Sequence, residues 1–263
     1  MLQRYIYSLL SLLAFATSAS DLDKERRWEA QIVDGLLDGE AIHLTDKHGE
    51  FLALSTPASD GNSERIAIIV HGTGVHPDWP TVVQPLRVGL TERGWQTLSI
   101  QMPVLANDAE HGAYAALYDQ VPGRLDAAIH YARGMGAKTL ALIAHSQGAT
   151  MSAFYLAKGG EPVAGFLAIG MGPGIANGPM DNLRHLKRIK LPMLDLYGSD
   201  DLQAVMASAG QRKSIASQAN PQYRQRMIQG ADHFFDGEEQ VLLQVTGDWL
   251  DQLNQKQPAA SVR

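Results

Sequence analysis

The chain of 263 residues contains no cysteine. Disulfides, a thiol nucleophile, thiolate-bound metal sites and a cysteine-linked lipid anchor are therefore excluded. Because exported proteins can fold without disulfides, this absence gives no information about the compartment in which the protein works.

An excess of positive charge is also missing. Lys and Arg number 22 against 28 Asp and Glu, which gives a net charge of −6. Nucleic-acid binding needs a basic stripe or patch, so this balance argues against a nucleic-acid partner. No dinucleotide-binding fingerprint occurs, and the glycine-rich segment 171–178 lacks the spacing and the lysine of a phosphate-cradling loop. No cofactor is expected.

The sequence has no apolar run of the length, about 20 residues, that a membrane-spanning helix needs. Its N-terminus instead has one positive residue, Arg4, then a short apolar stretch over 5–16 and small residues after it. This pattern predicts a secretory signal peptide over residues 1–20, cleaved after Ala19 or Ser20, and hence a periplasmic or secreted protein without a stable membrane span. The alternative is an uncleaved anchor or a helix packed on the domain.

The rest of the chain alternates between apolar, strand-like runs and helix-sized segments. The eight candidate strands are Ala41–Asp46, Gly49–Pro57, Arg65–Val70, Gln96–Met102, Thr139–Ala144, Val163–Gly170, Leu191–Gly198 and Gln222–Gly230. This alternation predicts an α/β fold with a mostly parallel eight-stranded sheet and helices on both faces. The first two strands form a hairpin and would supply the antiparallel edge. Residues 21–263 are expected to form a single domain.

The helices are expected between these strands. One is predicted over Pro80–Gly94, where the helical pattern stops at a glycine. Others are predicted from about Pro122, from Ser146, and over 237–255 at the end of the chain.

Ser146 lies where an apolar strand stops abruptly, in the sequence AHSQG. The G-x-S-x-G pattern places a nucleophilic serine on a sharp strand-to-helix turn, and small residues two before and two after it make room for that turn. Ala144 stands where the pattern has glycine and adds only a methyl group, whereas Gly148 matches. The alternative is a serine that merely caps the helix.

A serine hydroxyl needs a base to take its proton and an acid to orient that base. In α/β folds of this kind the acid and then the histidine follow the serine along the chain. Asp200 and Asp201 follow the strand Leu191–Gly198, and His233 follows the last strand. Because functional residues gather at the carboxyl ends of strands in open α/β sheets, either aspartate could serve as the acid.

Together, the motifs VHGTG, AHSQG, YGSDD and GADHFF resemble the α/β-hydrolase superfamily, over roughly Ile66–Leu250. Within it, the segment His71–Leu105 and GADHFFDG resemble a group of exported α/β-hydrolase-like proteins of Gram-negative bacteria. The superfamily pattern Gly-x-x-Asp favours Asp201 as the acid, with Asp200 as the adjacent alternative.

The oxyanion of an acyl-transfer reaction needs hydrogen-bond donors. One is expected to be the backbone N–H of Gln147, the residue after the nucleophile. The resemblance implies the Thr73 N–H as the other, and glycines on either side of Thr73 would let the backbone approach the substrate closely.

The remaining histidines receive other roles. The resemblance implies that His71 is a structural, hydrogen-bonded residue, and His145 is expected to point away from the nucleophile. His130 falls in a predicted helix and is expected to be structural. The other histidines show no paired metal-ligand spacing, so no metal site is expected.

The walls of the site are predicted from the loops. The interval Met171–Lys190 is too short for a large lid domain and is expected to contribute an active-site loop. The irregular segment Pro103–Val121 would overhang the site and bring Tyr114 and Tyr118 to it, while Trp79 would line another wall. These features favour a small or medium acyl group as substrate.

The predicted function is therefore a serine hydrolase that cleaves an acyl bond through Ser146, His233 and Asp201. A carboxylic ester is the expected substrate, and an amide or a thioester is the alternative. The competing hypothesis is a catalytically silent envelope protein that keeps the fold and binds a ligand or partner. The sequence leaves the oligomeric state open.

Overall fold

A computed structural model describes residues 20–256 of the chain. Apart from Ser20, the predicted signal peptide lies outside these residues. Within the described part, no helix is long and apolar enough to cross a membrane.

The eight strands belong to one sheet in the order β1-β2-β4-β3-β5-β6-β7-β8. They are β1 (Glu40–Asp46), β2 (Gly49–Thr56), β3 (Arg65–Val70), β4 (Gln96–Ile100), β5 (Thr139–His145), β6 (Gly165–Ile169), β7 (Met193–Asp200) and β8 (Tyr223–Asp232). Strand β2 pairs antiparallel with both β1 and β4, and every other neighbouring pair is parallel. The expected eight-stranded, mostly parallel sheet with an antiparallel hairpin at one edge is confirmed.

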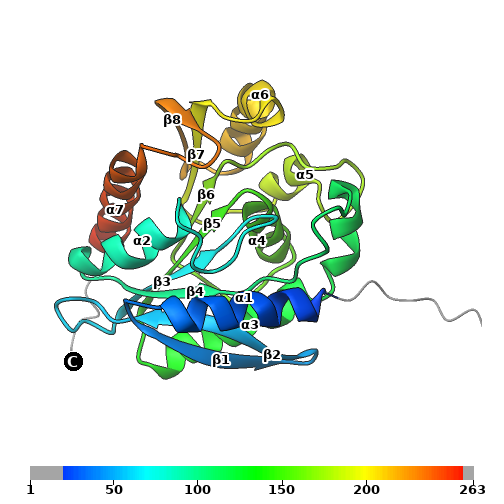
Figure 1. The fold of residues 1–263 in the computed structure, drawn as a ribbon. Helices are drawn as coiled ribbons and strands as arrows, with labels where there is room; N and C mark the ends of the chain where they lie inside the picture. Colours follow the sequence, from blue (N-terminus) through cyan, green and yellow to red (C-terminus); the bar gives the residue numbers. More distant parts are fainter. Residues whose placement is uncertain (1–19, 257–263) are drawn as a thin grey trace, which may run out of the picture.

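Helices cover both faces of this sheet (Figure 1). They are α1 (Leu22–Gly35), α2 (Val83–Gly89), α3 (Val121–Gly134), α4 (Gln147–Ala157), α5 (Asn182–Leu186), α6 (Gln203–Ala219) and α7 (Glu239–Lys256), with 3₁₀ helices η1 (Leu90–Arg93) and η2 (His111–Leu117). Helices α3, α4, α5 and α6 contribute to one hydrophobic cluster, α2 and α7 to a second, and α1 to a small third one against β2. The helical connections make the crossovers that a parallel sheet requires.

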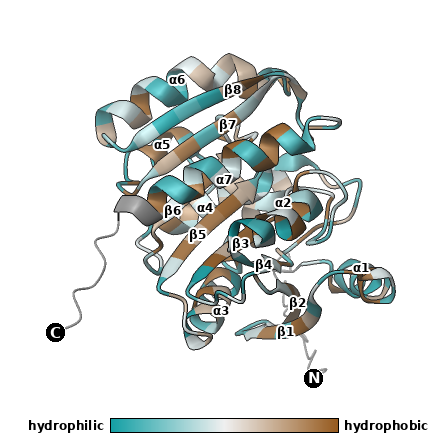
Figure 2. Cartoon of the chain, turned by 90° about the vertical axis from the view of Figure 1, so that its left-hand side faces the viewer, coloured by the Kyte–Doolittle hydropathy of each residue, from teal (hydrophilic) through white to brown (hydrophobic). Residues whose placement is uncertain are grey.

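The central strands are buried on both faces, which explains their continuous apolar sequences. In β3, Ile68 lies in the cluster under α3 and α4, whereas its neighbours Ala67 and Ile69 lie in the cluster under α2 and α7. Figure 2 shows the consequence: β5 is hydrophobic over most of its length, while the edge strand β8 is largely hydrophilic.

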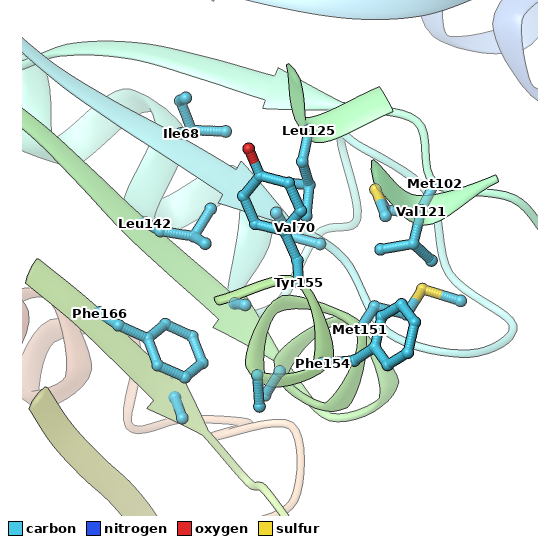
Figure 3. Packing of buried hydrophobic residues seen from close by; sticks show 14 of the residues in the cluster. Ile68, Val70, Met102, Val121, Leu125, Leu142, Met151, Phe154, Tyr155 and Phe166 are labelled. Atoms are coloured by element: carbon cyan, nitrogen blue, oxygen red, sulfur yellow. The ribbon is translucent and has the colours of Figure 1, made fainter. Parts of the chain in front are cut away.

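Helix α4 is the central helix on its side of the sheet. Tyr155 projects from it toward Ile68 of β3 and Leu142 of β5 (Figure 3). Met151 and Phe154 project toward Val121 of α3 instead. Nearly all residues of α4 are buried, so its position relative to the sheet is fixed by packing over most of its length. The first residue of this helix follows Ser146 directly, so the same packing also fixes the serine.

The helix predicted over Pro80–Gly94 differs from the structure. Helix α2 begins only at Val83, because Val82 adopts a backbone conformation with φ of 52°, outside the helical region. The last turn tightens into η1, and Gly94 ends it with φ of 71°. The glycine stop is thus correct, whereas the start is three residues too early.

Candidate active site

Ser146 sits in a sharp turn between β5 and α4, with φ of 54° and ψ of −118°. Non-glycine residues rarely adopt a positive φ, and such strain is concentrated at functional sites. The turn needs a small neighbour, because a Cβ on Gly148 would lie 2.3 Å from the His71 carbonyl oxygen. Ala144, which replaces the expected glycine, is buried in β5 without preventing the turn.

The Ser146 hydroxyl does not make the hydrogen bond that a helix-capping serine makes. Although Ser146 occupies the cap position of α4, its side chain makes no capping hydrogen bond. Instead its Oγ lies 2.9 Å from Nε2 of His233. The hydroxyl therefore donates to an imidazole nitrogen when His233 is neutral, which is the geometry of a base-activated nucleophile.

The other ring nitrogen of His233 faces an acid. Its Nδ1 lies 2.6 Å from Oδ1 of Asp201, and the aspartate is almost completely buried. The same carboxylate accepts the backbone N–H of Leu202 at 2.7 Å, which fixes its orientation. Ser146, His233 and Asp201 thus form one continuous hydrogen-bonded chain at the carboxyl ends of β5, β7 and β8.

Asp200 is placed differently from Asp201. It ends β7 with an exposed side chain, and its Oδ1 accepts a hydrogen bond from the hydroxyl of Ser199. The aspartate that reaches His233 is therefore Asp201. Asp195, in the interior of β7, forms a buried ion pair with Arg212 and is not part of this hydrogen-bonded chain.

Gly170, directly after β6, supports the His233 ring. Its φ is +61°, and a Cβ at this position would lie 2.9 Å from Cε1 of His233. Glycine is required here both by the backbone conformation and by the close approach of the imidazole.

If Ser146 and His233 act together in a reaction, we expect Gly170→Ala to lower its rate by at least about a hundredfold, because displacing a reacting group by about 1 Å costs that much. Gly210→Ala in α6 is the matched control, since a Cβ there meets nothing within 4 Å. Steady-state kinetics of the two variants give the comparison. Equal rates in both would show that the ring does not depend on Gly170.

Two other buried histidines brace the site without facing the nucleophile. His71 donates from Nδ1 to the Gly72 carbonyl and accepts the Met102 N–H at Nε2, as expected of a structural residue. His145 donates from Nε2 to the backbone carbonyl of His233 at 2.9 Å. It therefore ties the strand before the nucleophile to the loop that carries His233.

Burial keeps both of these rings neutral. It lowers the pKa of His71 to about 3 and that of His145 to about 4, with the neighbouring His233 adding to the second effect. In the unfolded chain both would titrate near the ordinary value of 6.5.

Stability should consequently fall as the pH drops below 6.5. Between pH 6.5 and about 4 these two histidines are protonated in the unfolded chain but not in the folded protein. Each of them therefore lowers the free energy of unfolding by about 1.4 kcal/mol for every unit by which the pH falls. We expect His145→Phe to reduce this slope by about that amount, measured by urea unfolding between pH 6 and 4.5. Replacing the exposed His48 with Gln serves as control, and an unchanged slope in His145→Phe would contradict the prediction.

The two predicted oxyanion donors belong to the start of α4 and to the loop after β3. Gln147 is the first residue of α4, where backbone N–H groups have no partner within the helix. Thr73 is exposed in the loop after β3. No acceptor within residues 20–256 takes either N–H. The same loop touches the nucleophile, because a Cβ on Gly72 would lie 2.9 Å from Cβ of Ser146.

A pocket of about 210 Å³ opens over Ser146 and His233, and we call it the acyl pocket. Its other walls come from α4, from the loop after β6, from the start of α6 and from η2; they are Gln147, Thr150, Gly170, Gly172, Pro173, Gly174, Leu202, Ala204, Val205 and His111. The expectation that the glycine-rich segment after β6 borders the site agrees with this lining.

The three aromatic residues predicted to line the site, Trp79, Tyr114 and Tyr118, are not among the residues that line this pocket. Tyr114 is buried in the core, where its hydroxyl accepts the Leu105 N–H. Tyr118 is also buried, and its hydroxyl accepts a hydrogen bond from the side chain of Gln147. Trp79 packs with the cluster under α2 and α7. The rings of Tyr114 and Tyr118 are buried in the core, whereas Trp79 is half-buried beside it.

The segment Pro103–Val121, which contains Tyr114 and Tyr118, nevertheless reaches the pocket through a residue that the sequence analysis did not predict there. His111, at the start of η2, lines the acyl pocket, and its isolated position in the sequence offers no signal. Leu202 also lines it with an exposed side chain. Leu202 follows Asp201 directly, so its place beside the site could have been predicted once Asp201 was taken as the acid.

The fold is that of α/β-hydrolases. An esterase of Pyrococcus furiosus superposes with a TM-score of 0.69 at 13% identity, over 84% of this chain and 92% of the esterase. A dienelactone hydrolase from Anabaena variabilis gives 0.67 at 18% identity, over 81% and 96% of the two chains. An α/β serine hydrolase homologue from Coxiella burnetii gives 0.63 at 18% identity, over 83% and 99%.

No curated protein matches the sequence. A protein family does match it, over residues 16–117 and 106–252, which together cover most of the chain. The chain therefore belongs to the family described as "Protein of unknown function (DUF3530)".

Proposed function

We propose that this protein is a serine hydrolase that cleaves a carboxylic ester by way of an acyl-enzyme. The observation that carries the proposal is the hydrogen-bonded chain from Ser146 through His233 to Asp201, with distances of 2.9 and 2.6 Å. The strained backbone of Ser146 at the end of β5 adds to it. The fold likeness to esterases is consistent with this activity.

In the first step the Ser146 oxygen attacks the ester carbonyl carbon while His233 Nε2 takes the hydroxyl proton. The Thr73 and Gln147 N–H groups stabilise the negative charge that develops on the carbonyl oxygen. His233 then returns the proton to the departing alcohol, which leaves the acyl group on Ser146. Asp201 accepts the Nδ1–H of His233 throughout, and it thereby holds the tautomer that leaves Nε2 free to accept a proton.

In the second step water attacks the acyl-enzyme along the same path. His233 takes a proton from water, the carboxylic acid forms, and the proton returns to Ser146. No group beyond these side chains and backbone donors is needed to balance the reaction.

Labelling with a fluorophosphonate probe tests the proposal. We expect one covalent adduct, located on Ser146 by mass spectrometry of the digested protein, and prior denaturation should abolish it. A folded protein that neither labels nor hydrolyses any ester would instead support a ligand-binding protein without catalytic activity.

The acyl pocket predicts a preference for short acyl chains. Its volume of about 210 Å³ is below the range of ~300–1,000 Å³ that is usual for drug-sized ligands. Among p-nitrophenyl esters we expect kcat/KM for the butyrate to exceed that for the decanoate at least about tenfold. A rate that rises steadily with chain length would contradict this prediction.

The N-terminal pattern of residues 1–20 supports export, and we propose that the protein acts in the periplasm or outside the cell. Sequencing the N-terminus of the protein recovered from the periplasm of a Gram-negative host tests this. A start at Ser20 or Asp21 is expected, and retention of Met1 in the cytoplasmic fraction would contradict it.

A further inference from the structure

A second concave site lies on the same side of the sheet as α4, away from the catalytic residues. It has a volume of about 310 Å³ and is formed by the C-terminal half of α4, the loop 177–179 and α5 with the turn after it. Three cations, Lys158, Arg184 and Arg188, line it together with His185 and Phe154. We call this site the basic pocket.

The charge of the basic pocket is unusual for this protein. No aspartate or glutamate lines it, although the chain as a whole carries a net charge of −6. Among the described residues, no carboxylate lies within ion-pair distance of Lys158, Arg184 or Arg188. By contrast, Arg93 on the opposite face pairs with two aspartates.

Asp181 is the carboxylate that acts on this region. It caps α5 by accepting the backbone N–H of Arg184, and it also accepts the N–H of Asn177. Its oxygens bond to the backbone, and it forms no ion pair with the side-chain cations of the basic pocket.

The walls of the basic pocket are held in place. His185 donates from Nε2 to the Pro179 carbonyl at 2.8 Å, and its ring packs edge-on against Phe154 at 5.7 Å. The Lys158 ammonium lies over the Phe154 ring, 4.9 Å from the ring centre. Lys158 and Arg184 both act electrostatically on His185, so the charges converge on one region.

The basic pocket is separate from the acyl pocket. Thr150 lines the acyl pocket, and Phe154, four residues or about one helical turn later on α4, lines the basic pocket. Between them the buried Asn182 donates from Nδ2 to the Thr150 hydroxyl and to the Gly172 carbonyl. This side chain ties α4 to the loop after β6 and separates the two cavities.

We propose that the basic pocket binds a phosphoryl group. Two guanidinium groups offer paired N–H donors that match phosphate oxygens, and the ammonium of Lys158 adds a third charge toward a dianion. A bound phosphoryl group supplies the negative charge that this cluster lacks among its own neighbours. The group can belong to a free phosphorylated small molecule or to the headgroup of an anionic lipid.

Calorimetric titration of the whole protein at low ionic strength tests the proposal, with inorganic phosphate in one arm and phosphatidic-acid vesicles in the other. We expect saturable binding in at least one arm, and that arm identifies the source of the group. Arg184→Gln combined with Arg188→Gln should weaken it by at least about tenfold, because charge-assisted hydrogen bonds are lost. Arg224→Gln with Arg226→Gln removes the same charge from exposed positions on β8 and should bind as wild type does.

Ser146→Ala should also bind as wild type does, since the proposal is independent of the active site. Absence of saturable binding in both arms would overturn the proposal. Equal binding by wild type and by the Arg184/Arg188 variant would overturn it as well. The fluorophosphonate labelling of that variant, which leaves the catalytic residues in place, verifies that it is folded.

Discussion

Replacing Ser146 with alanine is expected to lower kcat/KM for a short-chain ester on the order of 10⁴-fold or more, which is the loss that follows removal of the nucleophile in serine hydrolases. The hydroxyl is the group that His233 Nε2 contacts, at 2.9 Å, and no other described serine or threonine hydroxyl contacts that nitrogen. Without it, no acyl-enzyme can form. The oxyanion donors remain, and they account for the residual rate.

Ser152→Ala is the matched control for this experiment. Ser152 lies six residues further along on the same helix, is fully buried, and has a hydroxyl without a hydrogen-bond partner among the described residues. Its removal should leave both kcat/KM and the thermal transition close to those of wild type. If Ser146→Ala retains wild-type hydrolysis while Ser152→Ala also does, the nucleophile is another group and the proposed mechanism fails.

Replacing Asp201 with asparagine is expected to lower kcat by about four orders of magnitude, as the equivalent change does in other Ser-His-Asp hydrolases. The carboxylate accepts the Nδ1–H of His233 at 2.6 Å, whereas an asparagine can present its NH₂ group to that nitrogen and favour the wrong tautomer. The change also removes the negative charge that stabilises the imidazolium in the transition state.

Asp200→Asn provides an unusually close comparison, because it removes the same charge one residue away. The Asp200 side chain is exposed and bonds only to Ser199, so kcat should change by less than about threefold. Steady-state kinetics of both variants, with circular dichroism to verify folding, decide the matter. A larger loss of kcat in Asp200→Asn than in Asp201→Asn would show that Asp200 is the acid and that the proposed assignment is wrong.

Much of the architecture follows from the order of the residues alone. Apolar runs such as Arg65–Val70 and Thr139–Ala144 are too continuous for half-exposed strands, and their alternation with helix-sized segments requires crossover connections and a parallel sheet. The turn at Ser146 could be located in the same way, because Gly148 and Ala144 mark a strand that reverses sharply into a helix. These features depend on local backbone conformation and on burial, and both leave a pattern in the sequence.

The identity of the acid is different, because it depends on side-chain direction across three strands. Asp200 and Asp201 are adjacent in the chain, and only the resemblance to a known superfamily favoured Asp201; in the structure, Asp201 is the one that contacts His233. Likewise the sequence placed Tyr114 and Tyr118 in a segment expected to overhang the site, but their rings are buried in the core. His111 reaches the acyl pocket only because η2 packs beside it.

The sequence by itself thus determined the order of strands and helices, the strained turn and the set of groups that could act as acid and base. The tertiary structure decided which aspartate faces His233 and which side chains line the acyl pocket. It also brought Lys158 together with Arg184 and Arg188 in the basic pocket. The physical reason is that periodicity and turn chemistry act over a few residues. Contacts between distant segments are set by how the helices and loops pack on the sheet.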